Sequence, residues 1–475
     1  MKHSLKLYLS SFGLAGLLAA GGLASCAKDE PAPATTTPTT PTTTSTPTTP
    51  ATPQYGTPFA GVPNREDAAI YQVNMRAFSQ GGNLAGVTAR LDSIKALGVN
   101  VVYLMPIYPV GQVRSVNSPY CVKDYSAVGS EFGTLADLRT LVDGAHQRGL
   151  AVMLDWVANH TSWDHAWITD HPDWYLQNAA GVIQSPPSTN YTDVAQLNFS
   201  SAPMRLAMIA AMKQWVYTAN VDGFRCDYAD APTIQASTFW QQAVDTLRHV
   251  KTHKLLLLAE GDKPANFTAG FDYTFSYNYY GNLKSVYRSN ATATTLDAST
   301  FDYSGSTGTQ QPVRFITNHD VNDSDGTPVQ LFGGNAGAMS AFVVAACYRG
   351  VPFVYNGQEA GMTQKITFPF TSVKVQWGAH PDVTRAYQLL LKARAASPAL
   401  SHGTATSYST ADVCAFTKQA GTEQALVLAN VRNATVQFAV PAALAGSWTN
   451  ALAGGSYALG TTVTLPAYGY LVLKK

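Results

Sequence analysis

Eight short apolar runs, spaced widely enough to leave room for helices between many of them, constrain the fold of this 475-residue chain most strongly. Near-continuous apolar runs are typical of strands in a parallel sheet that helices cover on both faces. One intervening stretch places Leu135, Leu138, Leu141, Val142 and Ala145 on a single helical face. Eight such units favour a closed (β/α)8 barrel over an open sheet. The predicted strands are Ala69–Val73, Val99–Met105, Ala151–Val157, Val221–Asp227, Lys254–Glu260, Phe271–Phe275, Val313–Asn318 and Pro352–Tyr355.

The N-terminus has the pattern of an export signal. Lys2 and Lys6 precede an apolar stretch that ends in Leu-Ala-Ser-Cys at Cys26, which predicts a signal peptide over residues 1–25. These four residues resemble the lipobox of bacterial lipoproteins, whose cysteine carries the lipid, although an ordinary signal peptide with an incidental cysteine is the alternative. The Lys-Asp-Glu that follows resembles a sorting signal for the cell surface. We therefore expect an exported protein that a lipid on Cys26 anchors to a bacterial membrane.

Composition divides the remaining chain into three segments. Residues 26–58 are mostly Thr, Pro, Ala and Ser, which predicts a disordered tether because few apolar side chains offset the entropy of ordering. The barrel is expected over residues 59–396, with an excursion over about 160–200 after the third strand. Short alternating runs in residues 397–475 predict a C-terminal antiparallel β-sandwich domain.

Charge and cysteine content exclude other classes of protein. The formal net charge is +1 and no basic run occurs, so a nucleic acid is not an expected partner. Apart from Cys26, the chain has four cysteines, whose spacing suggests neither a metal site nor a disulfide-dense fold.

Three carboxylates follow apolar strands, at Asp227, Glu260 and Asp320. A carboxylate at the end of a buried strand is costly unless it has partners, and the carboxyl ends of parallel strands meet at one end of a barrel. We therefore expect the three acids to form one cluster. Two acids that act on a glycosidic bond, with a third assisting, fit this arrangement. The sequence predicts an enzyme that cleaves sugars.

The residues around these acids resemble the signature regions of glycoside hydrolase family 13, the α-amylase family. The resemblance runs from about Ile70 to the C-terminus and implies a retaining mechanism on α-linked glucose polymers. Two weaker segments, 194–198 and 350–359, agree with it. The four stronger segments are Asp155-Trp156-Val157-Ala158-Asn159-His160, Gly223-Phe224-Arg225-Cys226-Asp227, Ala259-Glu260-Gly261 and Asn318-His319-Asp320.

The resemblance implies a role for each acid. Asp227 would be the nucleophile, Glu260 the proton donor and later the base, and Asp320 the stabiliser of the transition state. Arg225 lies two residues before Asp227, so both side chains share a face of the strand, and its guanidinium is expected to keep Asp227 ionised. The apolar strand and the neighbouring carboxylate are expected to raise the pKa of Glu260, as a proton donor requires.

Further residues match the family's substrate-binding positions. Tyr120 matches a tyrosine that stacks on the sugar ring, and His160 and His319 match histidines that hydrogen-bond the sugar. Arg225 completes the expected substrate-binding set. Asp155 matches the first signature aspartate, which we interpret as structural support for Arg225.

The chain departs from the family after the nucleophile, where Asp230 and Ala231 replace a frequent Lys-His pair. That histidine commonly supports a calcium site. Asn159 still matches the calcium asparagine, and Asp193 is a second candidate ligand. Because Ca²⁺ takes six to eight oxygen ligands, two candidates leave calcium open. Asn117 stands where exo-acting relatives usually carry aspartate, which favours internal cleavage.

The expected function is α-amylase-type hydrolysis of α-1,4-glucosidic bonds in starch or maltodextrins. An α-1,6-glucan hydrolase or a transglycosylase of the same family is the first alternative, because these enzymes share the motifs. A non-catalytic surface lipoprotein that only binds starch is the second. A binding protein would not need a nucleophile and a proton donor together, so Asp227 and Glu260 favour an enzyme.

Overall fold

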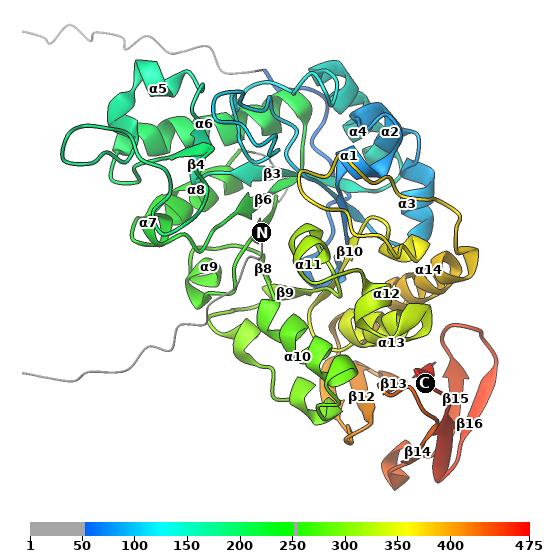
Figure 1. The fold of residues 1–475 in the computed structure, drawn as a ribbon. Helices are drawn as coiled ribbons and strands as arrows, with labels where there is room; N and C mark the ends of the chain where they lie inside the picture. Colours follow the sequence, from blue (N-terminus) through cyan, green and yellow to red (C-terminus); the bar gives the residue numbers. More distant parts are fainter. Residues whose placement is uncertain (1–52, 251–254) are drawn as a thin grey trace, which may run out of the picture. The chain divides into compact units, whose positions relative to one another are not determined.

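The structure, a computed structural model, describes residues 53–250 and 255–475. The expected signal peptide, Cys26 and most of the expected tether lie outside the described residues. Eight parallel strands close into a barrel in the order β1-β10-β9-β8-β7-β6-β3-β2, with helices outside it (Figure 1). The predicted (β/α)8 barrel is therefore confirmed. Its strands are β1 (Ile70–Val73), β2 (Val101–Leu104), β3 (Ala151–Val157), β6 (Gly223–Asp227), β7 (Leu256–Ala259), β8 (Tyr273–Phe275), β9 (Gln311–Arg314) and β10 (Val351–Tyr355).

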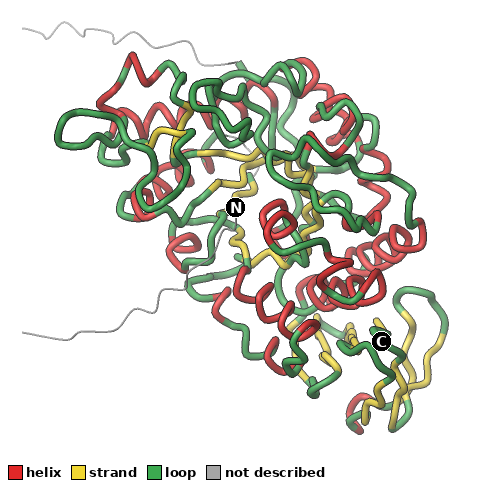
Figure 2. Tube along the Cα trace, viewed as in Figure 1, coloured by secondary structure: helices red, strands yellow, loops and turns green. Residues whose placement is uncertain are grey.

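The helices alternate with the strands, as the apolar periodicity predicted (Figure 2). In the helix that contains Leu138, Leu141, Val142 and Ala145, these four side chains are buried, and Thr134 forms a capping box with Asp137. The α-helices are α1 (Met75–Phe78), α2 (Leu84–Thr88), α3 (Leu91–Leu97), α4 (Leu135–Gln147), α5 (Trp167–Asp170), α6 (Ala202–Ala219), α7 (Pro232–Gln235), α8 (Phe239–Arg248), α9 (Pro264–Thr268), α10 (Tyr277–Arg288), α11 (His319–Ser324), α12 (Pro328–Leu331), α13 (Gly334–Cys347), α14 (Pro381–Ala395) and α15 (Pro398–His402).

One predicted strand boundary is wrong. The run Val313–Asn318 was expected to be a strand, but β9 ends at Arg314, and Asp320 lies in the first turn of α11. The side-chain oxygen of Asn318 accepts hydrogen bonds from the backbone N–H groups of Asp320 (3.0 Å) and Val321 (2.9 Å). This helix cap competes with strand extension, so an apolar run alone overestimated the strand.

The excursion after β3 contains a small antiparallel pair, β4 (His160–Ser162) and β5 (Val194–Gln196). In this pair His160 lies opposite Gln196. The excursion therefore brings a side chain from near its end back to the carboxyl end of β3.

The C-terminal strands form a six-stranded sheet in the order β11-β12-β13-β18-β15-β16 and a two-stranded sheet, β14-β17. All their pairings are antiparallel, and Trp448, Leu428 and Phe438 lie in their shared core. The expected antiparallel β-domain after the barrel is therefore confirmed. Its strands are β11 (Thr404–Ser407), β12 (Val413–Ala420), β13 (Glu423–Asn430), β14 (Val436–Ala439), β15 (Gly446–Asn450), β16 (Ser456–Leu459), β17 (Thr462–Leu465) and β18 (Tyr470–Lys474).

The last residues of the expected tether are bound to the barrel. The backbone N–H of Tyr55 donates to the carbonyl of Tyr217 (2.6 Å), and its hydroxyl donates to Asp143 (2.6 Å). Arg139 lies over the Tyr55 ring at 4.2 Å. Tyr55 therefore has both polar and aromatic contacts with the helices of the barrel. No helix among residues 53–250 and 255–475 has the length and hydropathy to cross a membrane.

Candidate active site

Arg225 joins three acids at the carboxyl end of the barrel strands. Its side chain is fully buried on β6, and Nη1 lies 2.7 Å from Oδ1 of Asp155 and 3.0 Å from Oδ1 of Asp227. Nη2 lies 2.7 Å from Oε1 of Glu260. The register explains this arrangement, because β3 and β6 pair Asp155 with Arg225, and Glu260 directly follows β7 on the other side. The predicted convergence of Asp227 and Glu260 is present.

Backbone geometry after Asp227 fixes the position of Glu260. The backbone N–H of Tyr228 donates to Oε2 of Glu260 at 2.6 Å. Tyr228 has a φ of 44°, in the left-handed region that a residue with a β-carbon rarely adopts. Strain of this kind persists only where the surrounding structure imposes it, and it is common at functional sites. Here it turns an N–H group toward the carboxylate of Glu260.

Asp320 completes the cluster from α11 and is its most exposed member. Its side chain is 48% exposed, compared with 12% for Asp227 and 17% for Glu260. One oxygen of Asp320 lies 3.3 Å from Nε2 of His319. Asp320 is therefore the acid of this cluster that solvent reaches most.

The predicted substrate-binding residues surround the acids. The Tyr120 hydroxyl lies 2.7 Å from Nε2 of His319 and 3.1 Å from Oδ2 of Asp155, and its ring stacks on the ring of His319 at 5.5 Å. Nε2 of His160 lies 3.2 Å from the carbonyl of Tyr120. Burial lowers the pKa of both His160 and His319 to about 4, so both rings are neutral near pH 7. They can hydrogen-bond a neutral sugar without adding positive charge.

The surroundings of Asp227 shift its pKa in the direction opposite to the expected one. Burial, followed by the charge of Glu260, raises the pKa of Asp227 well above its ordinary value, although Arg225 opposes this shift. Burial also raises the pKa of Asp155 and of Asp320. A single guanidinium charge faces Asp155, Asp227 and Glu260 together, so it offsets the burial of Asp227 and the charge of Glu260 only in part. Burial therefore favours the protonated form of Asp227 more than the sequence predicted.

Tyr277, at the start of α10, contacts two of the acids and was missed by the sequence analysis. Its hydroxyl lies 3.5 Å from Oε1 of Glu260 and 3.5 Å from Oδ2 of Asp320, and it accepts a hydrogen bond from Nδ2 of Asn318 at 3.2 Å. The ring stacks on Phe275 at 5.6 Å. The sequence signal that could have found Tyr277 is its place two positions after the predicted strand Phe271–Phe275, because other strands also carry functional residues at or just after their ends.

Asp230, which replaces a family lysine, ties the loop after Asp227 to the loop after Glu260. Its carboxylate accepts from the backbone N–H of Asp262 (3.0 Å) and from Nδ2 of Asn266 (2.7 Å). Gly261 must be glycine here, because its φ is +149° and a β-carbon would lie 2.2 Å from Cγ of Asp230. The substitution thus supports the position of Glu260.

Asn159 and Asp193, the residues expected to bind calcium, bond to other residues of the described chain. Nε2 of Gln196 donates to the side-chain oxygen of Asn159 (3.1 Å), to its carbonyl (2.9 Å) and to the carbonyl of Leu197 (2.9 Å). These three oxygens therefore accept hydrogen bonds from one amide group. The backbone carbonyl of Asp193 accepts a hydrogen bond from the Sγ–H group of Cys121 (3.3 Å). The described part of the chain contains no group of three or more histidine, cysteine, aspartate or glutamate residues that could hold a metal.

Comparisons with known proteins agree with this geometry. Residues 54–192 match the family model described as the α-amylase catalytic domain. The chain is 28% identical over 312 residues to α-amylase MalA of Haloarcula japonica, covering 62% of this chain and 44% of that protein. It is 31% identical over 197 residues to oligo-1,6-glucosidase of Parageobacillus thermoglucosidasius, covering 34% of each chain. The alignments thus span less than half the length of these two curated relatives.

The fold comparison covers more of the chain. The crystal structure of an α-amylase from Lactobacillus plantarum superposes with a TM-score of 0.76 at 28% identity, covering 86% of this chain and 99% of that one. Together with the closed barrel and the acids at its carboxyl end, these matches show that the chain is similar to proteins of the α-amylase family.

Proposed function

We propose that the protein hydrolyses α-1,4-glucosidic bonds of starch or maltodextrins with retention of configuration at the anomeric carbon. The observation that carries the proposal is the contact of one buried guanidinium with both Asp227 and Glu260, 3.0 Å and 2.7 Å away. This contact holds close together, at one end of the barrel, the two carboxyl groups that a retaining glycosidase requires. Relatives named α-amylase support the choice of substrate.

In the proposed first step, a carboxylate oxygen of Asp227 attacks the anomeric carbon, and the bond to the leaving oxygen breaks. Glu260 gives its proton to that oxygen, so the shortened glucan leaves as an alcohol. In the second step, Glu260 takes a proton from water, the water oxygen bonds to the anomeric carbon, and Asp227 leaves as a carboxylate. Each turnover consumes one water molecule and restores both carboxyl groups.

The charges around the guanidinium of Arg225 agree with the proton transfers in these two steps. The cluster of Asp155, Asp227 and Glu260 carries three acids against one fixed positive charge, and burial disfavours three negative charges together. In the proposed first step Glu260 carries the proton that the leaving oxygen needs. Asp320, with His319 beside it, would bind ring hydroxyls and stabilise the positive charge of the transition state.

Product analysis tests the proposal. Soluble starch should release reducing ends, and proton NMR should show the α-anomer first. Amylose, pullulan and maltotriose separate the alternatives, because an α-1,6-hydrolase cuts pullulan in preference to amylose and a transglycosylase lengthens maltotriose. The matches to oligo-1,6-glucosidases favour α-1,6 cleavage as the second candidate. If the protein bound starch but released no product, the alternative of a non-catalytic starch-binding lipoprotein would be favoured instead.

Removing the hydroxyl of Tyr277 should slow catalysis without weakening substrate binding. The Tyr277→Phe variant loses the group 3.5 Å from both Glu260 and Asp320 but keeps the packed ring. Because a hydrogen bond to a charged group contributes about 1.5–3 kcal/mol, we expect kcat to fall roughly 10- to 100-fold with little change in KM.

The matched control for Tyr277→Phe is Tyr280→Phe on the same helix. The Tyr280 hydroxyl donates to Asp325 at 2.9 Å, away from the acids, so this variant should keep wild-type kcat. Equal losses in the two variants, or a change in KM alone for Tyr277→Phe, would show that Tyr277 does not position the acids.

Chelation should leave activity and stability unchanged. Calcium takes six to eight oxygen ligands, whereas Asn159 and Asp193 are two candidates, and the side-chain oxygen of Asn159 already accepts a hydrogen bond from Gln196. Starch hydrolysis and the melting temperature should therefore be the same after dialysis against EDTA as in about 2 mM CaCl₂. That concentration is close to the dissociation constants of the weakest calcium sites in proteins. A melting temperature that falls by several degrees in EDTA would show that the protein binds a structural metal.

We infer that the protein is exported and anchored to a bacterial membrane by a lipid on Cys26. The basic, apolar and small-residue pattern that ends in Leu-Ala-Ser-Cys supports this proposal. Cells grown with labelled palmitate should incorporate the label into the wild-type protein and not into Cys26→Ser. Equal labelling of the two proteins, or labelling of neither, would exclude a lipid at this position.

A further inference from the structure

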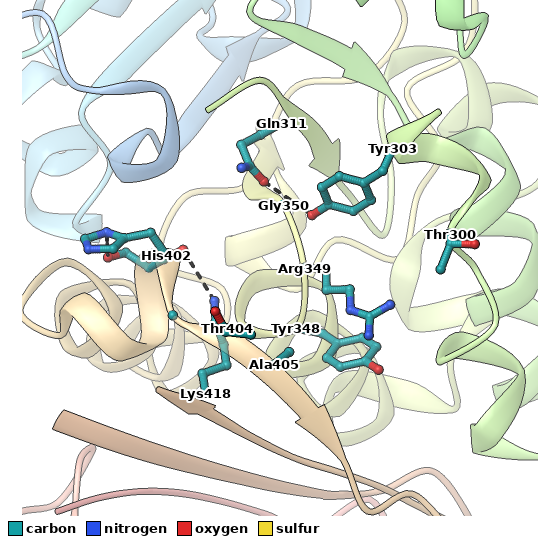
Figure 3. A pocket seen from close by; sticks show the side chains of 12 residues that line it. Thr300, Tyr303, Gln311, Tyr348, Arg349, Gly350, His402, Thr404, Ala405 and Lys418 are labelled. Atoms are coloured by element: carbon teal, nitrogen blue, oxygen red, sulfur yellow. Dashed lines mark hydrogen bonds between the residues drawn. The ribbon is translucent and has the colours of Figure 1, made fainter. Parts of the chain in front are cut away.

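A hollow of about 390 Å³ lies at the end of the barrel opposite the acids. It is bordered by Gln311 at the start of β9 and Gly350 just before β10, and by residues of α15, β11 and β12. Figure 3 shows Tyr303, Tyr348 and Arg349 around it, with the amine of Lys418 reaching toward the end of α15. No proposed catalytic or substrate-binding residue lines this hollow, so it is a separate feature of the molecule.

Two buried cations meet beside this hollow. Lys418 on β12 is 4% exposed, and its Nζ donates to the carbonyls of Leu400 (2.6 Å) and Ser401 (3.3 Å). Arg394 on α14 is 2% exposed, and its Nη2 donates to the same Ser401 carbonyl at 3.3 Å. The other hydrogen bonds of Arg394 also go to carbonyls, those of Ala346, Ala68 and Glu66.

No carboxylate of the described chain forms an ion pair with Lys418 or Arg394. A buried charge without a counter-charge is costly, and two like charges that share one carbonyl add to the cost. Burial, followed by the charge of Arg394, lowers the pKa of Lys418 to about 7, while the nearby Cys347 opposes the shift. Burial lowers the pKa of Arg394 to about 10. Near pH 7, therefore, Arg394 is charged and Lys418 is charged in part, and a bound anion would favour the charged form of Lys418.

A third cation borders the hollow with free hydrogen-bonding capacity. The guanidinium of Arg349 lies 4.9 Å from the ring centre of Tyr348, and Nη1 donates to the carbonyl of Asp297 at 3.4 Å. That single long bond leaves most of its N–H groups available. No aspartate or glutamate is among the residues that line the hollow. A guanidinium with open donors is suited to binding an oxyanion.

We propose that this hollow binds an oxyanion, with Lys418 and Arg349 as the groups that contact it. A structural role for Lys418 as a cap of α15 explains its bonds to Leu400 and Ser401. That role does not explain why Arg394 is buried beside it or why no acid lines the hollow. A phosphate group would bring negative charge and acceptor oxygens to the N–H groups of Lys418 and Arg349. The volume leaves room for an attached sugar, so both inorganic phosphate and a sugar phosphate fit.

A thermal-shift titration of the full chain tests the site without any glucan. Sodium phosphate and glucose 6-phosphate are added separately at pH 7, against sodium chloride at matched ionic strength. Ligand that binds the folded state raises the melting temperature, so the rise should saturate for at least one phosphate and not for chloride. The more effective of the two distinguishes a free ion from a sugar phosphate. A rise that depends only on ionic strength would overturn the proposal.

Substitutions inside and outside the hollow test whether phosphate binds there. Lys418→Met should weaken phosphate binding by about tenfold or more, because a charge-assisted hydrogen bond is lost. Lys392→Met removes the same charge from an exposed position of α14 and should bind as the wild type does. Arg349→Gln, at a half-buried position, provides an independent test if Lys418→Met does not fold. Unchanged binding in either folded variant of the hollow would exclude the site.

Discussion

Asp227→Asn should abolish hydrolysis while the protein remains folded. The amide is a poor nucleophile, so no covalent glycosyl-enzyme forms, and we expect kcat on starch to fall by a factor on the order of 10⁵. Arg225 keeps its contacts with Asp155 and Glu260, at 2.7 Å each, so the strand ends stay in place. Initial rates of reducing-end release, measured over long incubations, give the residual activity.

The stability of Asp227→Asn has a definite expected sign. The folded-state pKa of Asp227 is raised above its ordinary value, chiefly by burial, so the folded state disfavours the ionised form. Ionised Asp227 therefore lowers the free energy of unfolding at pH values above the ordinary aspartate pKa, and neutral asparagine removes that effect. The melting temperature at pH 7 should be equal to or above that of the wild type. A large fall would mean that lost activity reflects unfolding.

Asp325→Asn is the matched control, since Asp325 bonds Tyr280 and Lys284 outside the acidic cluster. This variant should retain wild-type turnover. A direct assignment comes from a fluorinated α-glucosyl fluoride, which slows release of the covalent intermediate. Mass spectrometry should find the label on the peptide containing Asp227 in the wild type. A label on another residue, or wild-type turnover by Asp227→Asn, would overturn the assignment of the nucleophile.

The sequence was sufficient to predict the barrel because its strands are buried on both faces. Residues 101–104 and 151–157 are buried in β2 and β3, and Asp155 is the one charged residue in these runs, so they are easy to recognise. The convergence of Asp227 and Glu260 follows from the topology alone, because the carboxyl ends of parallel neighbours meet. The resemblance to signature regions added the expected identity of each acid.

What the sequence could not predict depends on contacts between distant residues. The raised pKa of Asp227 arises from its burial and from the charge of Glu260, which follows another strand, so no local motif contains it. The amide of Gln196 lies 37 positions from Asn159, yet it donates to the side-chain oxygen of Asn159. The burial of Lys418 beside Arg394 likewise appears only when β12 packs against α14 and α15.

Glu260→Gln should separate the two steps of catalysis according to the leaving group. On starch the leaving oxygen needs a proton, so loss of the acid should lower kcat by about 10²–10⁴-fold. On α-maltosyl fluoride the leaving fluoride needs little protonation, so Asp227 should still be glycosylated and the covalent intermediate should accumulate. Azide, which attacks without losing a proton, should then restore turnover and give an α-glycosyl azide.

The pH profile of Glu260→Gln provides a second readout that loss of folding would not produce. Protonated Asp227 cannot attack, so kcat/KM falls as the pH drops through the pKa of Asp227, which in the wild type lies well above 3.8. The charge of Glu260 is the second-largest cause of that raised pKa. With α-maltosyl fluoride as the substrate, its removal should move the acid limb to lower pH. An unmoved limb, together with equal losses on fluoride and starch, would mean that Glu260 is not the proton donor.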